Sequence, residues 1–185
     1  MNFLKRIEQL LRRAKFLQPS VLAAVKSFSL RREFLRHRDE WLVRSLRSVP
    51  NDSPFQHLMA VVDRSRVLWF DIMTQYRAGF STQVPIQDDT QPAAVTDEVK
   101  RLHVASDEST ALLAGWVTVH VRDFRNTLLR CLPYISDLSS VSRAMDQCMY
   151  FGASLGRLGA DFRAILIPIF EQHIESVMTR LWQQV

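Results

Sequence analysis

The chain has 185 residues, of which 47% are hydrophobic and 23% are charged, and a formal net charge of +5. This length suits one domain, and the apolar fraction is large enough for a core, which excludes a wholly disordered chain. Two cysteines exclude a disulfide framework and a cysteine metal site, and five glycines and seven prolines disfavour β-sandwiches and barrels. Composition therefore favours a soluble, helix-rich protein.

The positive charge is concentrated at the start of the chain. Residues 1–50 hold 12 lysines and arginines against 4 acidic residues, whereas the remainder holds 12 against 15. Such a basic segment is most often a solvated helix face. The alternative is a surface that contacts nucleic acid, anionic lipid or an acidic partner.

Targeting and membrane signals are not expected. The opening residues, Met1 to Arg6, reach charge too early for a signal peptide, and no run approaches the roughly 18–20 apolar residues that span a bilayer. Cys131 and Cys148 lie in apolar stretches, where buried reduced thiols are expected. A cytosolic setting follows, with only a peripheral role at any membrane.

The basic start, residues 1–29, is predicted to be helical and amphipathic. One short helix is expected over residues 2–17, and a second begins at Pro19, because proline suits the first helical position. A third helix is expected over about 30–48, with one apolar stripe formed by Leu35, Leu42, Leu46 and Val49.

A proline-rich turn separates that helix from the next. Pro50 disfavours helical geometry at the residue before it, and Ser53 with Pro54 supplies an N-cap and a first-turn proline. Over residues 54–80 two apolar stripes run side by side, which predicts a helix covered on more than one side, as in the middle of a bundle. The first stripe is Phe55, Met59, Val62, Trp69, Met73, Tyr76 and Phe80, interrupted by Arg66, and the second is Val61, Leu68 and Ile72. Residues 30–80 thus form a helical pair around a Pro-Asn-Asp turn.

The second half of the chain begins with a polar segment. Residues 81–105 lack periodicity and are predicted to be a flexible loop, and a helix is expected from about 106 to 132, where Pro133 stops it. Residues 137–184 keep a four-three rhythm and predict one long helix, which Pro168 should kink near Ala164–Ile165. Residues 106–185 are therefore a helical bundle segment. The predicted fold is all-α, an elongated bundle of long antiparallel helices that forms one structural unit.

No catalytic, cofactor-binding or metal-binding residue can be assigned. The histidines lack the i, i+4 partner of a helical metal site, and no H-E-x-x-H occurs among His37, His57, His103, His120 and His173. His120 and His173 lie near apolar stripes, so hydrogen-bonded interior histidines are expected rather than ligands. Asp88 and Asp89 lie in the polar loop, where burial is not expected to tune their pKa. No cofactor is expected, and the partner-binding residues are unknown.

A glycine-rich stretch and several charged residues allow structural and functional interpretations. Residues 152–160 lack the spacing of phosphate-binding loops, and Gly152 and Gly159 are one heptad apart, which favours a packing notch for another helix. Arg157 and Asp161 form a predicted i, i+4 pair. The further charged residues that look buried are Arg66, Asp71, Arg77 and Arg163. An Arg–Asp pair between two helices would fix the register of those helices. The alternative is that these charged residues line a functional cleft.

Two long blocks carry a family resemblance. Residues 49–54 lead into 66–80, and the second block runs from Gln147 to Gly152 and on through 159–163. Both resemble the subunit-eight family of the conserved oligomeric Golgi complex. Shorter matches fall in the same order, at Phe34-Leu35, residues 38–42 and Gly115-Trp116, so the resemblance covers roughly residues 30–180. Trp69 and Gly79 depart from the residues expected there, as repacking changes.

The resemblance implies a non-enzymatic, helical-rod vesicle tether, peripheral on the cytosolic face of the Golgi membrane. Such proteins support intra-Golgi retrograde transport and Golgi organisation through helix–helix contacts. The implied partners are subunits five, six, seven and one of the same complex, with fusion proteins and small GTPases contacting the complex as a whole. Family members are considerably longer, with a helical region before the matched part that usually carries assembly contacts.

The sequence also allows two other classes of function, a basic binding module and an enzyme. Residues 1–50 could form a basic helical module for nucleic acid or anionic membrane, whose binding would weaken steeply with salt. Few aromatic residues interleave with the basic ones and no nucleic-acid motif is present, so nucleic acid is not an expected partner. An enzyme is the least favoured class, and would require a pocket with convergent titratable groups.

Overall fold

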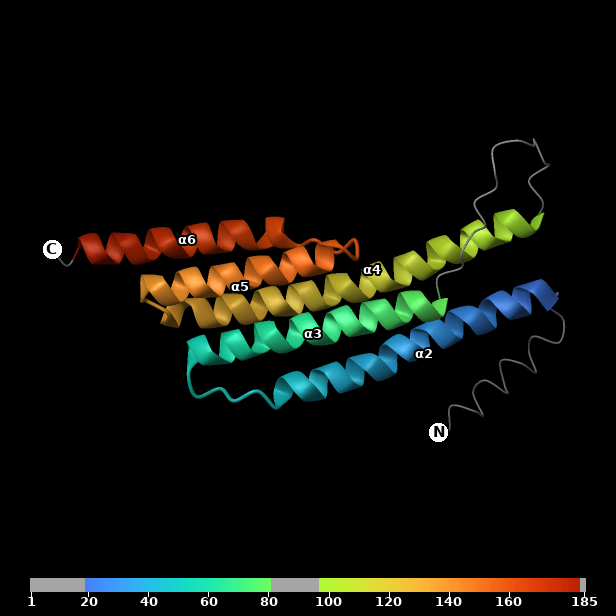
Figure 1. Cartoon of the computed structure of the whole chain (residues 1–185), viewed down its shortest axis with the longest axis horizontal. Helices are drawn as coiled ribbons and strands as arrows, with labels where there is room; N and C mark the ends of the chain where they lie inside the picture. Colours follow the sequence, from blue (N-terminus) through green and yellow to red (C-terminus); the bar gives the residue numbers. More distant parts are fainter. Residues whose placement is uncertain (1–18, 81–96, 184–185) are drawn as a thin grey trace.

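The computed structural model describes residues 19–80 and 97–183, and this part of the chain folds as an elongated all-α bundle (Figure 1). Each helix runs antiparallel to the one before it, so the predicted fold is confirmed. The elements are α2 (Pro19–Arg47), α3 (Pro54–Phe80), α4 (Asp97–Cys131), the 3-10 turn η2 (Leu132–Tyr134), α5 (Leu138–Gly156) and α6 (Arg163–Trp182).

Several helix ends follow directly from local sequence. Pro19 and Pro54 are the first residues of α2 and α3, as predicted, and the Ser53 carbonyl accepts a hydrogen bond from the His57 amide at 2.8 Å. Asp137 caps α5, because its Oδ2 accepts from the Ser140 amide at 2.9 Å. Hydrogen bonds from Ser139 and Ser140 lower the pKa of Asp137 to about 2.

The predicted helix boundaries were wrong in three places. A single helix, α2, replaces the two expected on either side of residue 30, because no glycine or proline interrupts the chain between residues 20 and 47. Helix α4 begins at Asp97 rather than near 106, so residues 97–105 belong to a helix and not to a loop. Asp97 and Glu98 are the acids that favour this earlier start. The predicted helix over 2–17 and the segment 81–96 lie outside the described residues.

The single helix expected over 137–184 is also two helices. The chain reverses over residues 157–162, where Gly159 adopts φ +65° and its amide donates to the Gly156 carbonyl at 2.9 Å. Glycine takes this left-handed conformation without steric cost. Helix α6 then continues through Pro168, its sixth residue, so the chain is interrupted at residues 157–162, before the position near Ala164–Ile165 where the kink was predicted.

Helix α3 lies in the middle of the bundle, in contact with α2, α4 and α5. Six of its buried residues come from the two predicted stripes, and they join the same hydrophobic core as Leu35 and Leu42 of α2, whereas Leu58 and Ser65 were in neither stripe. The prediction of a helix covered on more than one side is confirmed. The buried residues of α3 are Leu58, Val61, Val62, Ser65, Trp69, Ile72, Met73 and Tyr76.

Five aromatic rings fill the centre of this core. The indole of Trp69, 1% exposed, lies 5.0 Å from the ring of Phe151, 6.1 Å from Phe162 and 6.4 Å from Phe124, measured between centroids. Trp116 adds a T-shaped contact at 6.1 Å. Tilted and edge-to-face pairs contribute about 0.5–1.5 kcal/mol each beyond the area they bury. We call these residues the aromatic cluster. It joins α3, α4, α5 and the N-cap of α6.

Candidate functional site

A buried histidine connects α4 to α2. His120 Nε2 lies 2.6 Å from Asp39 Oδ1, and the imidazole is flanked by the rings of Trp116 and Trp69 at 4.3 and 5.6 Å. Burial lowers the pKa of His120, although the carboxylate of Asp39 acts in the opposite direction. His120 is thus an interior histidine that is hydrogen-bonded, as predicted, and it links two helices.

Two further histidines make backbone contacts. His173 is buried on α6, and its Nε2 lies 2.9 Å from the carbonyl oxygen of Ile135, which confirms the interior role predicted for it. His57 Nδ1 lies 2.8 Å from the carbonyl oxygen of Pro50 and fastens the α2–α3 turn to the start of α3. The side chain of His103 lies outside the described residues.

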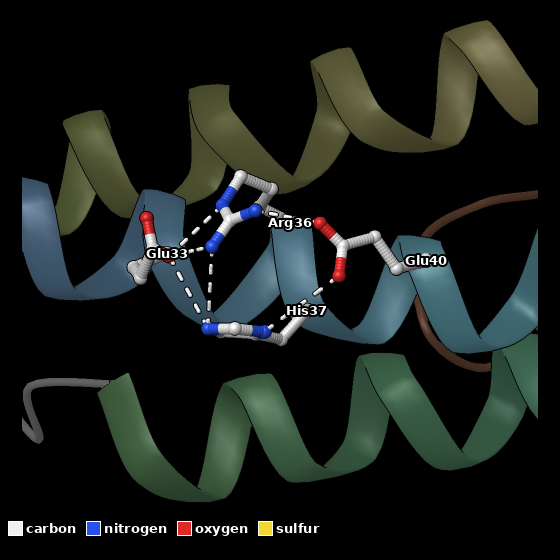
Figure 2. A network of polar contacts seen from close by, with 4 residues as sticks. All are labelled: Glu33, Arg36, His37 and Glu40. Carbon is white, nitrogen blue, oxygen red and sulfur yellow. Dashed lines mark hydrogen bonds and ion pairs between the residues drawn. The ribbon is translucent and has the colours of Figure 1, made fainter. Parts of the chain in front are cut away.

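The outer face of α2 carries a network of charged groups. Figure 2 shows Arg36 between Glu33 and Glu40, with His37 beside them. Arg36 Nε donates to Glu33 at 2.8 Å and Nη1 donates to Glu40 at 2.6 Å, while His37 Nε2 lies 3.2 Å from Glu33. The hydrogen bond from Arg36 lowers the pKa of Glu33. These contacts are those of a solvated helix face, and they occupy Arg36 within its own helix.

Polar side chains also bridge α2 and α3. Arg38 donates through Nη2 to the Gln75 side-chain oxygen, and Gln75 Nε2 donates to both carboxylate oxygens of Asp71 at 2.8 and 2.9 Å. The guanidinium of Arg38 lies 5.4 Å from the centroid of the Phe34 ring. Asp71 had been singled out in the sequence, but Arg38 and Gln75 had not, because their meeting depends on the register of two helices.

Two arginines of α3 contact α5 and the turn that follows it. Arg77 Nη2 donates to the carbonyl oxygen of Leu158 at 2.8 Å, which ties α3 to the turn after α5. The guanidinium of Arg66 lies 5.2 Å from the ring centroid of Tyr150. The crossing contact between these segments is therefore made to a backbone carbonyl and an aromatic ring rather than through an Arg–Asp pair.

The glycine-rich stretch forms a tight corner between α5 and α6. A Cβ on Gly152 would lie 2.6 Å from Arg163 Cγ, which confirms a close approach at this residue. Gly159 is exposed in the turn and does not line the predicted notch. Asp161 Oδ2 lies 2.6 Å from Arg163 Nη2. Asp161 does not form the predicted i, i+4 pair with Arg157, because α5 ends at Gly156 and the two residues do not share a helix. The ion pair with Arg163 lowers the pKa of Asp161.

The two cysteines are free and buried, as predicted. Burial raises the pKa of both thiols, that of Cys148 to about 12. Among the described residues, no group of three or more histidine, cysteine or acidic side chains could hold a metal ion.

A hollow lies where the C-terminal end of α2, the start of α3 and the C-terminal half of α4 meet. It is a groove of about 740 Å³ with apolar side chains along α2 and α3 and an arginine on each of two walls. The residues that line it include Val43, Leu46, Arg47, Val61, Thr127 and Arg130. The sequence does not predict this groove, because its walls come from three helices whose separation no periodicity encodes.

A family comparison agrees with the resemblance found in the sequence. A profile of the Dor1-like family matches residues 6–185. The chain belongs to the Dor1-like family. No solved structure matches it.

The curated relatives carry one shared name. The chain is 37% identical over 160 residues to the conserved oligomeric Golgi complex subunit 8 of Bos taurus, which covers 84% of this chain and 23% of that protein. The Drosophila melanogaster protein of the same name is 37% identical over 141 residues, 76% of this chain and 23% of its own length. The chain thus spans less than a quarter of the length of these relatives.

None of the helices in the described residues combines the length and the apolar character needed to cross a membrane.

Proposed function

We propose that the chain acts as a non-enzymatic subunit, or a section of one, in a Golgi vesicle-tethering complex. It would support intra-Golgi retrograde transport and Golgi organisation through helix–helix contacts, as a peripheral protein on the cytosolic face. Its partners would be other subunits of the conserved oligomeric Golgi complex, with subunits five, six, seven and one as the expected contacts. Fusion proteins and small GTPases would contact the assembled complex.

One observation carries the proposal. The named relatives align over 84% of the chain in both the bovine and the human protein, and the family profile extends across nearly its whole length. The match therefore includes the complete set of described helices rather than one short motif. A rigid all-α bundle with long exposed helix faces is also a suitable scaffold for helix–helix association.

The alternative, a basic module for nucleic acid or anionic membrane, receives less support. Within the described part of the basic segment, Arg36 is held by two carboxylates and Arg38 contacts Gln75 and the ring of Phe34. Phosphate binding would have to displace these contacts or depend on other residues.

Co-purification tests the proposed function. The tagged chain, expressed near its natural level, should recover other subunits of the complex, identified by mass spectrometry. A Trp69→Ala variant should lose them because the bundle core is damaged, whereas Gly115→Ala, at an exposed position with open space, should retain them. Recovery of the folded chain with no other subunit above the level in untagged cells would contradict the proposal.

A further inference from the structure

The groove between α2, α3 and α4 has the length and shape of a helix-binding site. Its α4 wall consists of His120, Asp123, Thr127 and Arg130, whose spacing of three and four residues places them on one helix face. From His120 to Cys131 this wall extends for about 16 Å, or about three turns of a helix.

Apolar side chains line the opposite wall and the floor. Val43 and Leu46 on α2 are half-buried, and Val61 on α3 is 6% exposed, so the lining already belongs to the edge of the core. An additional helix laid between α2 and α4 would pack over α3 in the manner of one more member of the bundle. The apolar face of an amphipathic helix suits this lining.

Charge determines which amphipathic helix fits. Arg47 on α2 and Arg130 on α4 are both exposed and stand on opposite walls, so positive charge flanks the apolar lining. The acidic residue on the wall, Asp123, has the guanidinium of Arg122 at 3.8 Å. The imidazoles of His57 and His120 are already engaged within the protein.

We propose that this groove binds an acidic amphipathic helix of a partner protein, with apolar side chains against Val43, Leu46 and Val61 and with carboxylates beside Arg47 and Arg130. The inference deepens the proposed function, on which it rests for the idea that the chain works through helix–helix contacts. It adds the surface and the chemistry of the partner.

A peptide titration with the full chain tests the inference. The probe is a fluorescent amphipathic peptide of about 15 residues, with leucine at every third or fourth position, glutamate on the flanking positions and capped ends. Arg47→Glu and Arg130→Glu should each weaken binding about three- to tenfold at low salt, and added salt should reduce this difference. Thr127→Trp, which fills the groove from a half-buried position, should weaken binding at least about tenfold.

Arg125→Glu is the matched control. Arg125 is an exposed arginine on α4 that lines a different, smaller hollow of about 330 Å³ with apolar walls. This variant should bind the acidic peptide as the unchanged protein does. A peptide with lysine in place of glutamate should bind more weakly than the acidic one. Circular dichroism and thermal unfolding establish that each variant is folded.

Four outcomes would overturn the inference. These are failure of the acidic peptide to bind at low salt, equal binding by the Arg47, Arg130 and Thr127 variants, loss of binding only in the Arg125 variant, and self-association of the chain through the groove. The last would assign the groove to a second copy, detected by sedimentation at increasing concentration. If groove variants that no longer bind the peptide still co-purify complex subunits, the proposed function stands and the groove is not the site. If the unchanged chain binds the peptide but co-purifies no subunit, the groove binds an acidic helix and the proposed function is contradicted.

Discussion

Helix α3 meets its neighbours in two different ways. Towards α4 and α5 it buries Trp69 in the aromatic cluster, where rings contact one another from several helices. Towards α2 it packs Tyr76 and Phe80 on the ring of Phe34 and adds polar bridges, through Gln75 to Arg38 and through Arg64, which donates to the carbonyl oxygen of Ser45 at 2.8 Å. Further along the same boundary the groove opens.

The two sides therefore contribute different properties to the bundle. Burial of apolar surface is strong and non-directional, and most of the ring pairs lie on the α4–α5 side, so that side should supply most of the stability. Polar bridges near the surface contribute little free energy but need specific partners, so they fix how α2 lies along α3. The boundary between α2 and α3, which polar bridges hold, can therefore contain the groove without disturbing the hydrophobic core.

The largest effect should come from Trp69. Trp69→Ala removes the central ring of the aromatic cluster and should lower the free energy of unfolding by about 3–5 kcal/mol, measured by urea denaturation. Trp69→Phe should cost clearly less, because it keeps a ring and removes an indole Nε1 that has no hydrogen-bond partner among the described residues. Equal losses in the two variants would show that ring contacts do not dominate this side.

A smaller loss is expected at the α5–α6 corner. In Gly152→Ala the new Cβ would meet Arg163 Cγ at 2.6 Å and its backbone nitrogen at 3.4 Å, so the Arg163 side chain or the start of α6 must shift, at about 1–3 kcal/mol. Gly115→Ala is the matched control, since no atom lies within 4 Å of its added methyl group. It should stabilise α4 by about 0.5–1 kcal/mol. The comparison fails if both alanines shift the thermal midpoint in the same direction.

On the α2 side, Asp39→Ala should cost less than either core change. The carboxylate that accepts from His120 is 40% exposed, so its loss should reduce the free energy of unfolding by about 1 kcal/mol or less. Hydrogen exchange should nevertheless increase in α2 more than in α5. A loss as large as that of Trp69→Ala would mean that the polar side supports the whole bundle.

The smallest effect is a pH dependence carried by His120. Its pKa is lowered in the folded state from the ordinary 6.5 by burial, so the unfolded chain takes up the proton first as pH falls. Stability should be complete above about pH 6.5 and should decrease below it until the folded pKa is passed. His120→Phe should show a shallower decrease between pH 8 and 5 in urea denaturation, and an unchanged slope would remove His120 as the cause.

Local signals predicted much of the fold. The prolines at positions 19 and 54 marked helix starts, and the stripes of α3 identified a helix in the middle of a bundle. The reversal at residues 157–162 escaped prediction because Leu155, Phe162 and Leu166 are all buried and keep helical spacing across the turn. The decisive sign was the left-handed conformation of Gly159, which spacing alone does not reveal.

The candidate site was much less accessible from the sequence. His120 was recognised as an interior residue by its place beside an apolar stripe, but its partner Asp39 lies two helices earlier in the chain. The groove depends on the separation of α2 and α4, which side-chain packing along their whole length determines. Arg47 and Arg130, the arginines on two walls of the groove, are not distinguished in the sequence, because other exposed arginines lie on the same helices.

The two thiols provide the molecule with built-in reporters of local opening. Cys131 lies beside the groove near the end of α4, whereas Cys148 is fully buried on α5 with a pKa of about 12. Since the thiolate is the nucleophile that attacks an alkylating reagent, neither residue should react while its helix stays packed. Modification of Cys131 would record fraying at one end of the rod, and modification of Cys148 would record separation of α5 from α3. Mass spectrometry of one sample would thus measure the alkylation rates of both cysteines, and with them the rates of two different openings, without an introduced label.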